Sequence, residues 1–104
     1  MTTNENTSTV FVYREGARFL VRPATVVVRA GQILRWTNYT KETIEVLIPQ
    51  THRLGLRGGE IGPGERLDQE VPAVAAGAYP FAVYLSEART FGEGNSGPII
   101  IIEV

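Results

Sequence analysis

The chain has 104 residues, of which 43% are apolar and 20% are charged, and its net charge at pH 7 is −1. This is the composition of one globular domain, and the near-neutral charge gives no electrostatic basis for nucleic-acid binding. The absence of cysteine excludes disulfides, thiolate metal sites and thiol chemistry. No apolar run approaches the roughly 18 residues of a membrane-spanning helix, so we expect no membrane insertion.

Apolar and polar residues alternate with a period of two along most of the chain, and no segment has the period of an amphipathic helix. The expected strands, in chain order, are Val10–Arg14, Arg18–Arg22, Thr25–Arg29, Ile33–Thr37, Thr43–Ile48, Arg66–Val71, Ala78–Leu85 and Ile99–Val104. Two Gly-rich stretches, Gln50–Gly64 and Phe91–Pro98, are expected to be long loops. Seven or eight short strands without a helix predict an all-β fold, an antiparallel Greek-key β-sandwich.

The first residues differ in character from the rest of the chain. Residues 1–8 are polar and lack the apolar centre of a signal peptide, so we expect a flexible polar tail before one domain at residues 9–104. The compartment stays open. It is cytoplasmic if the chain is natural as written, and periplasmic or extracellular if Met1 has replaced a leader.

Several segments, in their order along the chain, resemble the cupredoxin family, which includes plastocyanin and azurin. They combine a Pro, a strand, a Gly turn and Trp-x-Asn, then a short strand, a Pro-Gly-Glu turn, and a Gly-x-Tyr-x-Phe strand with a loop into the last strand. The segments are Pro23–Asn38, Thr43–Ile48, Gly62–Glu65, Gly77–Phe81 and Gly94–Ile100. The resemblance implies a cupredoxin-like topology over residues 9–104.

The resemblance also implies where copper ligands would stand. A type 1 copper centre uses two imidazoles, a thiolate and a weak axial thioether. The first His position falls at Ile44, or at Thr43 or Glu45 if the loop is one residue off. The Cys position falls at Val83, the second His position near Ser86 and the Met position near Asn95. Ile and Val have no atom that binds a metal, and burying each contributes roughly 1.5–3 kcal/mol of packing instead. We therefore expect no copper, no other cofactor and no blue-copper electron transfer.

The remaining candidates for chemistry are weak. His52 is the only imidazole in the chain, and we interpret it as a solvated loop residue, with a metal site shared with Glu60 or Glu45 as the alternative. One His with scattered carboxylates is poor spacing for a metal. Ser86 or Ser96 would need His52 as a base, and no Gly-x-Ser-x-Gly elbow is present. We expect that the protein is not an enzyme.

Five arginines fall on expected strands, mostly opposite the aromatic or β-branched residues: Arg14, Arg18, Arg22, Arg29 and Arg35. The simpler interpretation is the solvated outer face of a half-exposed sheet. The alternative is a basic stripe that fits an acidic partner.

The resulting hypothesis is a metal-free domain that binds or assembles with another protein. By the resemblance, the loops 38–42, 50–64 and 86–97 cluster at one end of the sandwich, where partners of the family dock. The candidate partner-binding residues form a mixed polar and aromatic set: His52, Arg53, Arg57, Glu60, Arg89, Phe91 and Asn95. The alternatives are a small-molecule or carbohydrate-binding domain, a redox or metal protein with an atypical site around His52, and a structural subunit, so a homo-oligomer stays open.

Overall fold

The computed structural model describes residues 6–49, 56–73, 76–93 and 98–103. Within these ranges the chain forms eleven strands and no helix. The strands are β1 (Thr7–Glu15), β2 (Arg18–Arg22), β3 (Thr25–Arg29), β4 (Ile33–Asn38), β5 (Ile44–Leu47), β6 (Gly59–Ile61), β7 (Arg66–Glu70), β8 (Gly77–Pro80), β9 (Ala82–Leu85), β10 (Thr90–Phe91) and β11 (Ile99–Glu103). Nothing in the described ranges forms a helix that could cross a bilayer.

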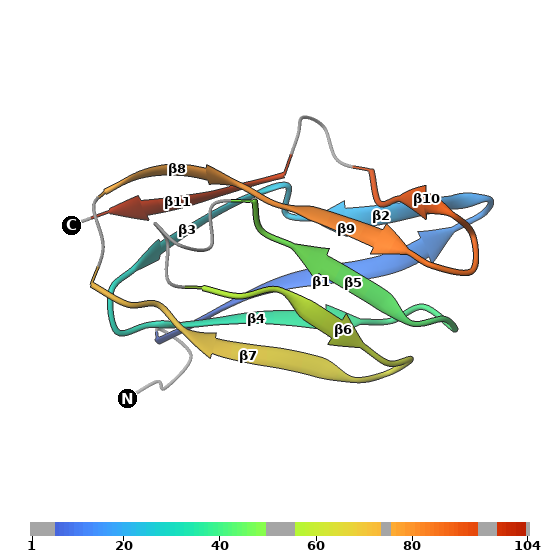
Figure 1. Ribbon diagram of the computed structural model, residues 1–104, viewed down its shortest axis with the longest axis horizontal. Helices are drawn as coiled ribbons and strands as arrows, with labels where there is room; N and C mark the ends of the chain where they lie inside the picture. The colour runs from blue at the N-terminus through green and yellow to red at the C-terminus, as the bar shows by residue number, and fades with distance from the viewer. Residues whose placement is uncertain (1–5, 50–55, 74–75, 94–97, 104) are drawn as a thin grey trace.

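The strands form three hydrogen-bonded sheets, ordered β2-β1-β4-β7, β10-β9-β5-β6 and β3-β11-β8. The chain passes from β8 straight into β9, so the second and third sheets continue one another (Figure 1). Buried residues from all three sheets belong to one apolar cluster. The architecture is therefore a β-sandwich with a single core, as the sequence predicts.

The period-two alternation correctly predicts which side chains are buried. In β3, Val26 and Val28 are 4% and 1% exposed, whereas Val27 between them is 46% exposed. The apolar run of β11 lies between β3 and β8 and is paired along both edges. A strand with both edges paired cannot add a strand from another molecule, so this run is protected from aggregation.

The strands are more numerous than expected, and the sheets are mixed. Two strand pairs, β1–β4 and β3–β11, are parallel. The expected strand Ala78–Leu85 divides at Phe81, whose N–H donates to the carbonyl of Pro98 at 3.0 Å, because β8 pairs with β11 and β9 pairs with β5. Two further strands, β6 and β10, lie in stretches expected to be loops. With three and two residues, they are too short to show an alternating pattern.

The first strand also begins earlier than expected. Thr7 and Ser8, which we assigned to the polar tail, pair with Ile33 and Leu34 of β4. Their backbone groups are satisfied by the sheet, which explains how polar residues extend a strand. Residues 1–5 lie outside the described ranges.

Four connections gather at one end of the sandwich, on the right in Figure 1: those between β1 and β2, β4 and β5, β6 and β7, and β9 and β10. We call this end, formed by residues 16–17, 39–43, 62–65 and 86–89, the loop end. Hydrogen bonds join its parts. The backbone carbonyl of Asn38 accepts from the N–H of Gly64 at 2.9 Å, and the N–H of Tyr39 donates to the carbonyl of Val12 at 2.7 Å.

Candidate functional site

The positions that the resemblance assigns to a copper histidine and a copper cysteine, Ile44 and Val83, lie inside the apolar core. They are 0% and 1% exposed. On the neighbouring strands β5 and β9, Ile44 pairs with Leu85 and Val46 pairs with Val83. None of these four side chains has an atom that binds copper, and the chain has no cysteine for a type 1 centre. The residues at these two positions therefore do not fit that metal.

The other two positions do not rebuild a ligand set. Ser86 is exposed in the turn between β9 and β10. Asn95 lies outside the described residues, as do His52 and Arg53. Across the described ranges, no group of three or more His, Cys, Asp or Glu side chains gathers closely enough to hold a metal ion.

A buried polar network holds the segment between β4 and β5. Asn38 and Thr40 are 0% and 5% exposed. The Asn38 side-chain NH₂ donates to the carbonyls of Glu42, Ile61 and Gly62 at 2.8, 3.0 and 3.1 Å. Its Oδ1 accepts from the N–H and the hydroxyl of Thr40 at 2.8 and 2.7 Å. Because a fully satisfied buried amide holds its neighbours in one arrangement, this part of the loop end is preformed.

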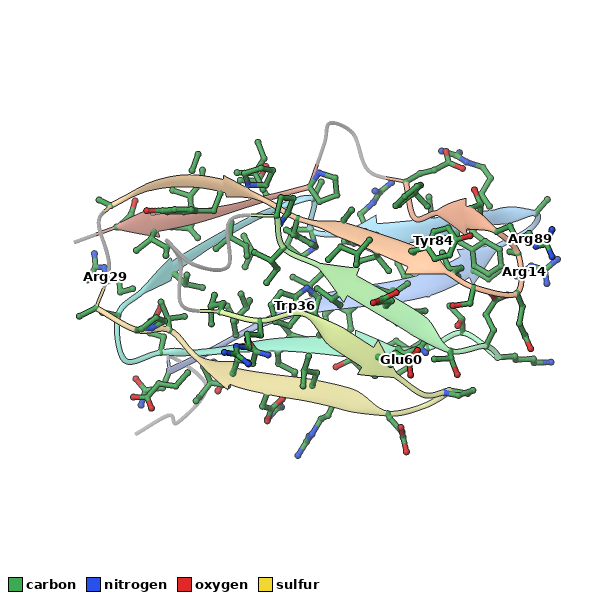
Figure 2. All side chains as sticks on the ribbon, viewed as in Figure 1. Arg14, Arg29, Trp36, Glu60, Tyr84 and Arg89 are labelled. Atoms are coloured by element: carbon green, nitrogen blue, oxygen red, sulfur yellow. The ribbon has the colours of Figure 1, made fainter. Side chains whose placement is uncertain are left out.

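The turn between β9 and β10 is attached to the same segment. The N–H of Ala88 donates to Glu42 Oε1 at 3.1 Å. Arg89 follows with a φ of 54°, in the left-handed region that non-glycine residues seldom adopt. Arg89 is exposed, and Phe91, two residues further on, is 54% exposed. The structure thus places two of the candidate partner-binding residues on one hairpin at the loop end, where Figure 2 also shows Arg14.

Four side chains form a row across the outer face of the sheet β10-β9-β5-β6. The strand register pairs Phe91 with Tyr84, Tyr84 with Glu45, and Glu45 with Glu60. We call these four residues the outer row; Figure 2 labels Tyr84 and Glu60 within it. The rings of Tyr84 and Phe91 meet edge to face, with centroids 5.1 Å apart. Since neighbouring strands lie about 4.8 Å apart, the row is roughly 14 Å long.

Two carboxylates, Glu45 and Glu60, form the acidic half of the outer row. The ion pairs of the described residues involve other side chains, so neither Glu45 nor Glu60 has a cationic partner there. Like charges directly opposite each other on a sheet are destabilising. An exposed Phe91 and a half-buried Tyr84 beside two carboxylates are suited to a cationic group. Aromatic rings attract such a group through their faces, and carboxylates bind it by charge-assisted hydrogen bonds.

Arg57 lies just before β6, and its backbone is held by a side chain of β7. Its backbone exchanges hydrogen bonds with the Gln69 side chain of β7: the N–H donates at 2.9 Å, and the carbonyl accepts in return. Arg57 therefore lies at the edge of the sheet β10-β9-β5-β6 opposite to the hairpin that carries Arg89 and Phe91. Gln69 holds Arg57 there, because its side-chain amide bonds both the N–H and the carbonyl of Arg57, which has no partner in a neighbouring strand.

The expected arginine face is largely neutralised. Arg18, Arg29 and Arg35 each form an ion pair with a carboxylate. Arg35 makes two parallel hydrogen bonds to Asp68, at 2.7 and 2.9 Å. These bonds hold the pKa of Asp68 below its usual value and raise the pKa of Arg35. The simpler interpretation, a solvated outer face, agrees with this pairing better than a free basic stripe does.

Two residues of the outer row, Glu45 and Tyr84, were outside the candidate partner-binding set. The alternation does place each opposite buried neighbours, since Ile44, Val83 and Leu85 face inward. What the sequence lacks is the pairing of β5 with β6 and β9, which brings these residues into one row with Glu60 and Phe91.

Comparison with solved structures identifies the architecture. A purple cupredoxin from Nitrosopumilus maritimus matches 92% of this chain and 99% of its own, with a TM-score of 0.59 and 15% identity. The chain has the cupredoxin fold. A point mutant of amicyanin in the Cu(I) state matches 95% of this chain and 84% of its own, with a TM-score of 0.58 and 14% identity. The copper-containing nitrite reductase from Thermus scotoductus SA-01 matches 94% of this chain with 22% of its own, at a TM-score of 0.57 and 16% identity.

These identities show a shared cupredoxin fold and no more. Neither a protein-family model nor a curated protein matches the sequence. What the chain does must therefore be inferred from its own residues.

Proposed function

We propose that this chain is a copper-free domain of cupredoxin fold that binds a basic segment of another protein, and that it neither carries electrons nor catalyses a reaction. The observation that carries the proposal is the strand register that aligns Phe91, Tyr84, Glu45 and Glu60. The apolar residues at the former ligand positions support its copper-free part, because Ile44 and Val83 occupy the core with no donor atom.

The chemistry of the outer row defines the partner. Aromatic side chains with exposed faces are frequent anchors in protein interfaces, because they bury a large area at little cost in conformational entropy. The two carboxylates can receive the planar fork of an arginine in a paired hydrogen bond, or a lysine as a point charge. A peptide with Arg or Lys beside a flat or apolar residue would satisfy both halves of the row.

The test is a titration followed by fluorescence anisotropy, with a fluorescein-labelled peptide of four alternating Arg and Gly pairs as the probe. We expect binding that weakens between 50 and 300 mM NaCl, and no binding of the matching Glu-Gly peptide. Glu60→Gln and Phe91→Ser should each weaken binding about fivefold or more. The matched control is Glu70→Gln, which removes an exposed carboxylate of β7 on a different sheet. Equal losses from Glu60→Gln and Glu70→Gln would mean that only net charge matters, and the assigned surface would be wrong.

The copper-free part has its own test, because His52 lies outside the described residues. Protein purified without a histidine tag should contain no stoichiometric copper, zinc or iron by elemental analysis. One equivalent of any of these metals, lost in a His52→Gln variant, would support the atypical metal site instead of this proposal.

A further inference from the structure

A second site lies at the loop end, away from the outer row. Here the β1–β2 hairpin and the segment 39–42 enclose a cavity of about 310 Å³. Three aromatic rings, two cations and one carboxylate contribute to its lining: Tyr13, Phe19, Tyr39, Arg14, Lys41 and Glu42. A volume of this size is at the lower limit of small-molecule pockets, so its ligand would have about a dozen heavy atoms.

The walls of the cavity are aromatic and held in place. Phe19 packs against the apolar core. The Tyr39 ring stacks on Phe11 with centroids 5.7 Å apart and planes 8° apart. The Thr40 hydroxyl is bonded to the Asn38 side chain and to the Glu42 carbonyl, which fixes the segment between them. A preformed wall loses little conformational freedom when a ligand enters, so small ligands can bind there.

The charges of the cavity favour an anion. Arg14 is positioned by a 2.7 Å hydrogen bond from its Nε to the Gly16 carbonyl, and its guanidinium lies 5.7 Å from the centre of the Phe19 ring. No carboxylate of the described residues forms an ion pair with Arg14 or Lys41. The one carboxylate of the lining, Glu42, already accepts the N–H of Ala88. The lining thus carries two cations against one carboxylate, a net charge of +1, and one oxygen of that carboxylate already accepts a hydrogen bond.

We propose that this cavity binds a small aromatic carboxylate. The ring of the ligand packs among Tyr13, Phe19 and Tyr39, and its carboxylate accepts hydrogen bonds from the terminal nitrogens of Arg14 and from Lys41. The inference is independent of the outer row, because none of the cavity residues belongs to that row. It would give the domain a small-molecule site in addition to its protein-binding face.

The experiment is an amide NMR titration of the intact protein at pH 7 with phenylacetate up to 10 mM, with phenylacetamide as the uncharged analogue. We expect saturable shifts confined to residues 13–19 and 39–42, and binding of phenylacetamide at least tenfold weaker. Arg14→Gln should weaken phenylacetate binding about tenfold. Arg29→Gln, an exposed arginine far from the loop end (Figure 2), should leave it unchanged.

Three results would overturn the site. They are the absence of saturable shifts up to 10 mM, equal affinity for phenylacetate and phenylacetamide, and equal weakening by Arg14→Gln and Arg29→Gln. The comparison of the two ligands uses the unaltered protein, so it decides the matter even if a variant folds poorly. Failure here would leave the protein-binding proposal untouched, since that assay depends on Glu60 and Phe91.

Discussion

Replacing Glu60 by Gln should stabilise the folded protein while it weakens partner binding. Glu60 and Glu45 are direct cross-strand neighbours, and the Cβ atoms of such pairs lie about 4.5–5.5 Å apart. Two unit charges at 6 Å repel by about 0.7 kcal/mol in water. In 10 mM salt nearly all of this remains, whereas a Debye length of about 8 Å at physiological salt reduces it to roughly 0.3 kcal/mol.

The expected consequence is a rise in melting temperature that depends on salt. For a domain of about 100 residues, 1 kcal/mol corresponds to about 4–8 °C, so Glu60→Gln should raise Tm by about 3–5 °C in 10 mM NaCl and by about 1–2 °C in 150 mM NaCl. The single tryptophan, Trp36, is fully buried and reports unfolding by its fluorescence. Glu70→Gln, which pairs with Ile33 rather than with a charge, should change Tm by less than about 1 °C. A lower Tm for Glu60→Gln, or a rise of the same size at both salt concentrations, would refute the repulsion.

Three further outcomes test the fold and its polar contacts. Asp68→Asn should lower the free energy of unfolding by up to about 0.5 kcal/mol at pH 7, because the bonds to Arg35 are partly exposed. Since the pKa of Asp68 is lowered in the folded state, this contribution is present above the unfolded pKa and disappears as pH falls through the folded pKa. The urea-unfolding curves of the variant and the unaltered protein should converge at that low pH. Ile44→Ala should reduce the free energy of unfolding by about 2–5 kcal/mol and Ile44→Val by about 0.5–1.5 kcal/mol; losses below 1 kcal/mol for both would show that the site is not packed as core. Asn38→Ala should lower the free energy of unfolding by about 2–4 kcal/mol, because buried carbonyl groups lose their hydrogen-bond donor. Chemical unfolding measures this change, and a neutral effect would argue against the buried network.

The sequence predicted the core of this fold well because a buried strand face needs only local information. Alternation in the stretches that became β3, β4 and β9 assigns inward side chains such as Val26, Trp36 and Val83 without knowledge of their partners. The same reasoning placed Ile44 and Val83 in the core. The alternation did not predict β6 and β10, which are short and pair with the longer strands β5 and β9. It also did not predict that the chain passes from one sheet to another at Phe81.

The candidate surface was harder to predict because it depends on contacts between distant segments. Glu60 and Phe91 lie 31 positions apart in the sequence, and only the pairing of four strands places them in one row. Arg57 illustrates the same dependence on distant segments. Its sequence position suggested the loop end, but Arg57 precedes β6, and the side-chain amide of Gln69 in β7 binds its backbone.

The strands β5 and β9 contribute both to the apolar core and to the outer row. In β5 and β9 the inward positions hold Ile44 and Val83, while the positions next to them, Glu45 and Tyr84, face outward. Because successive side chains alternate between the two faces, a slip of one residue would exchange the core with the surface, so tight packing on the inner face fixes the register of the outer row. Apolar side chains at the positions that the resemblance assigns to copper ligands thus hold the outer row in alignment, as the proposed protein-binding role requires.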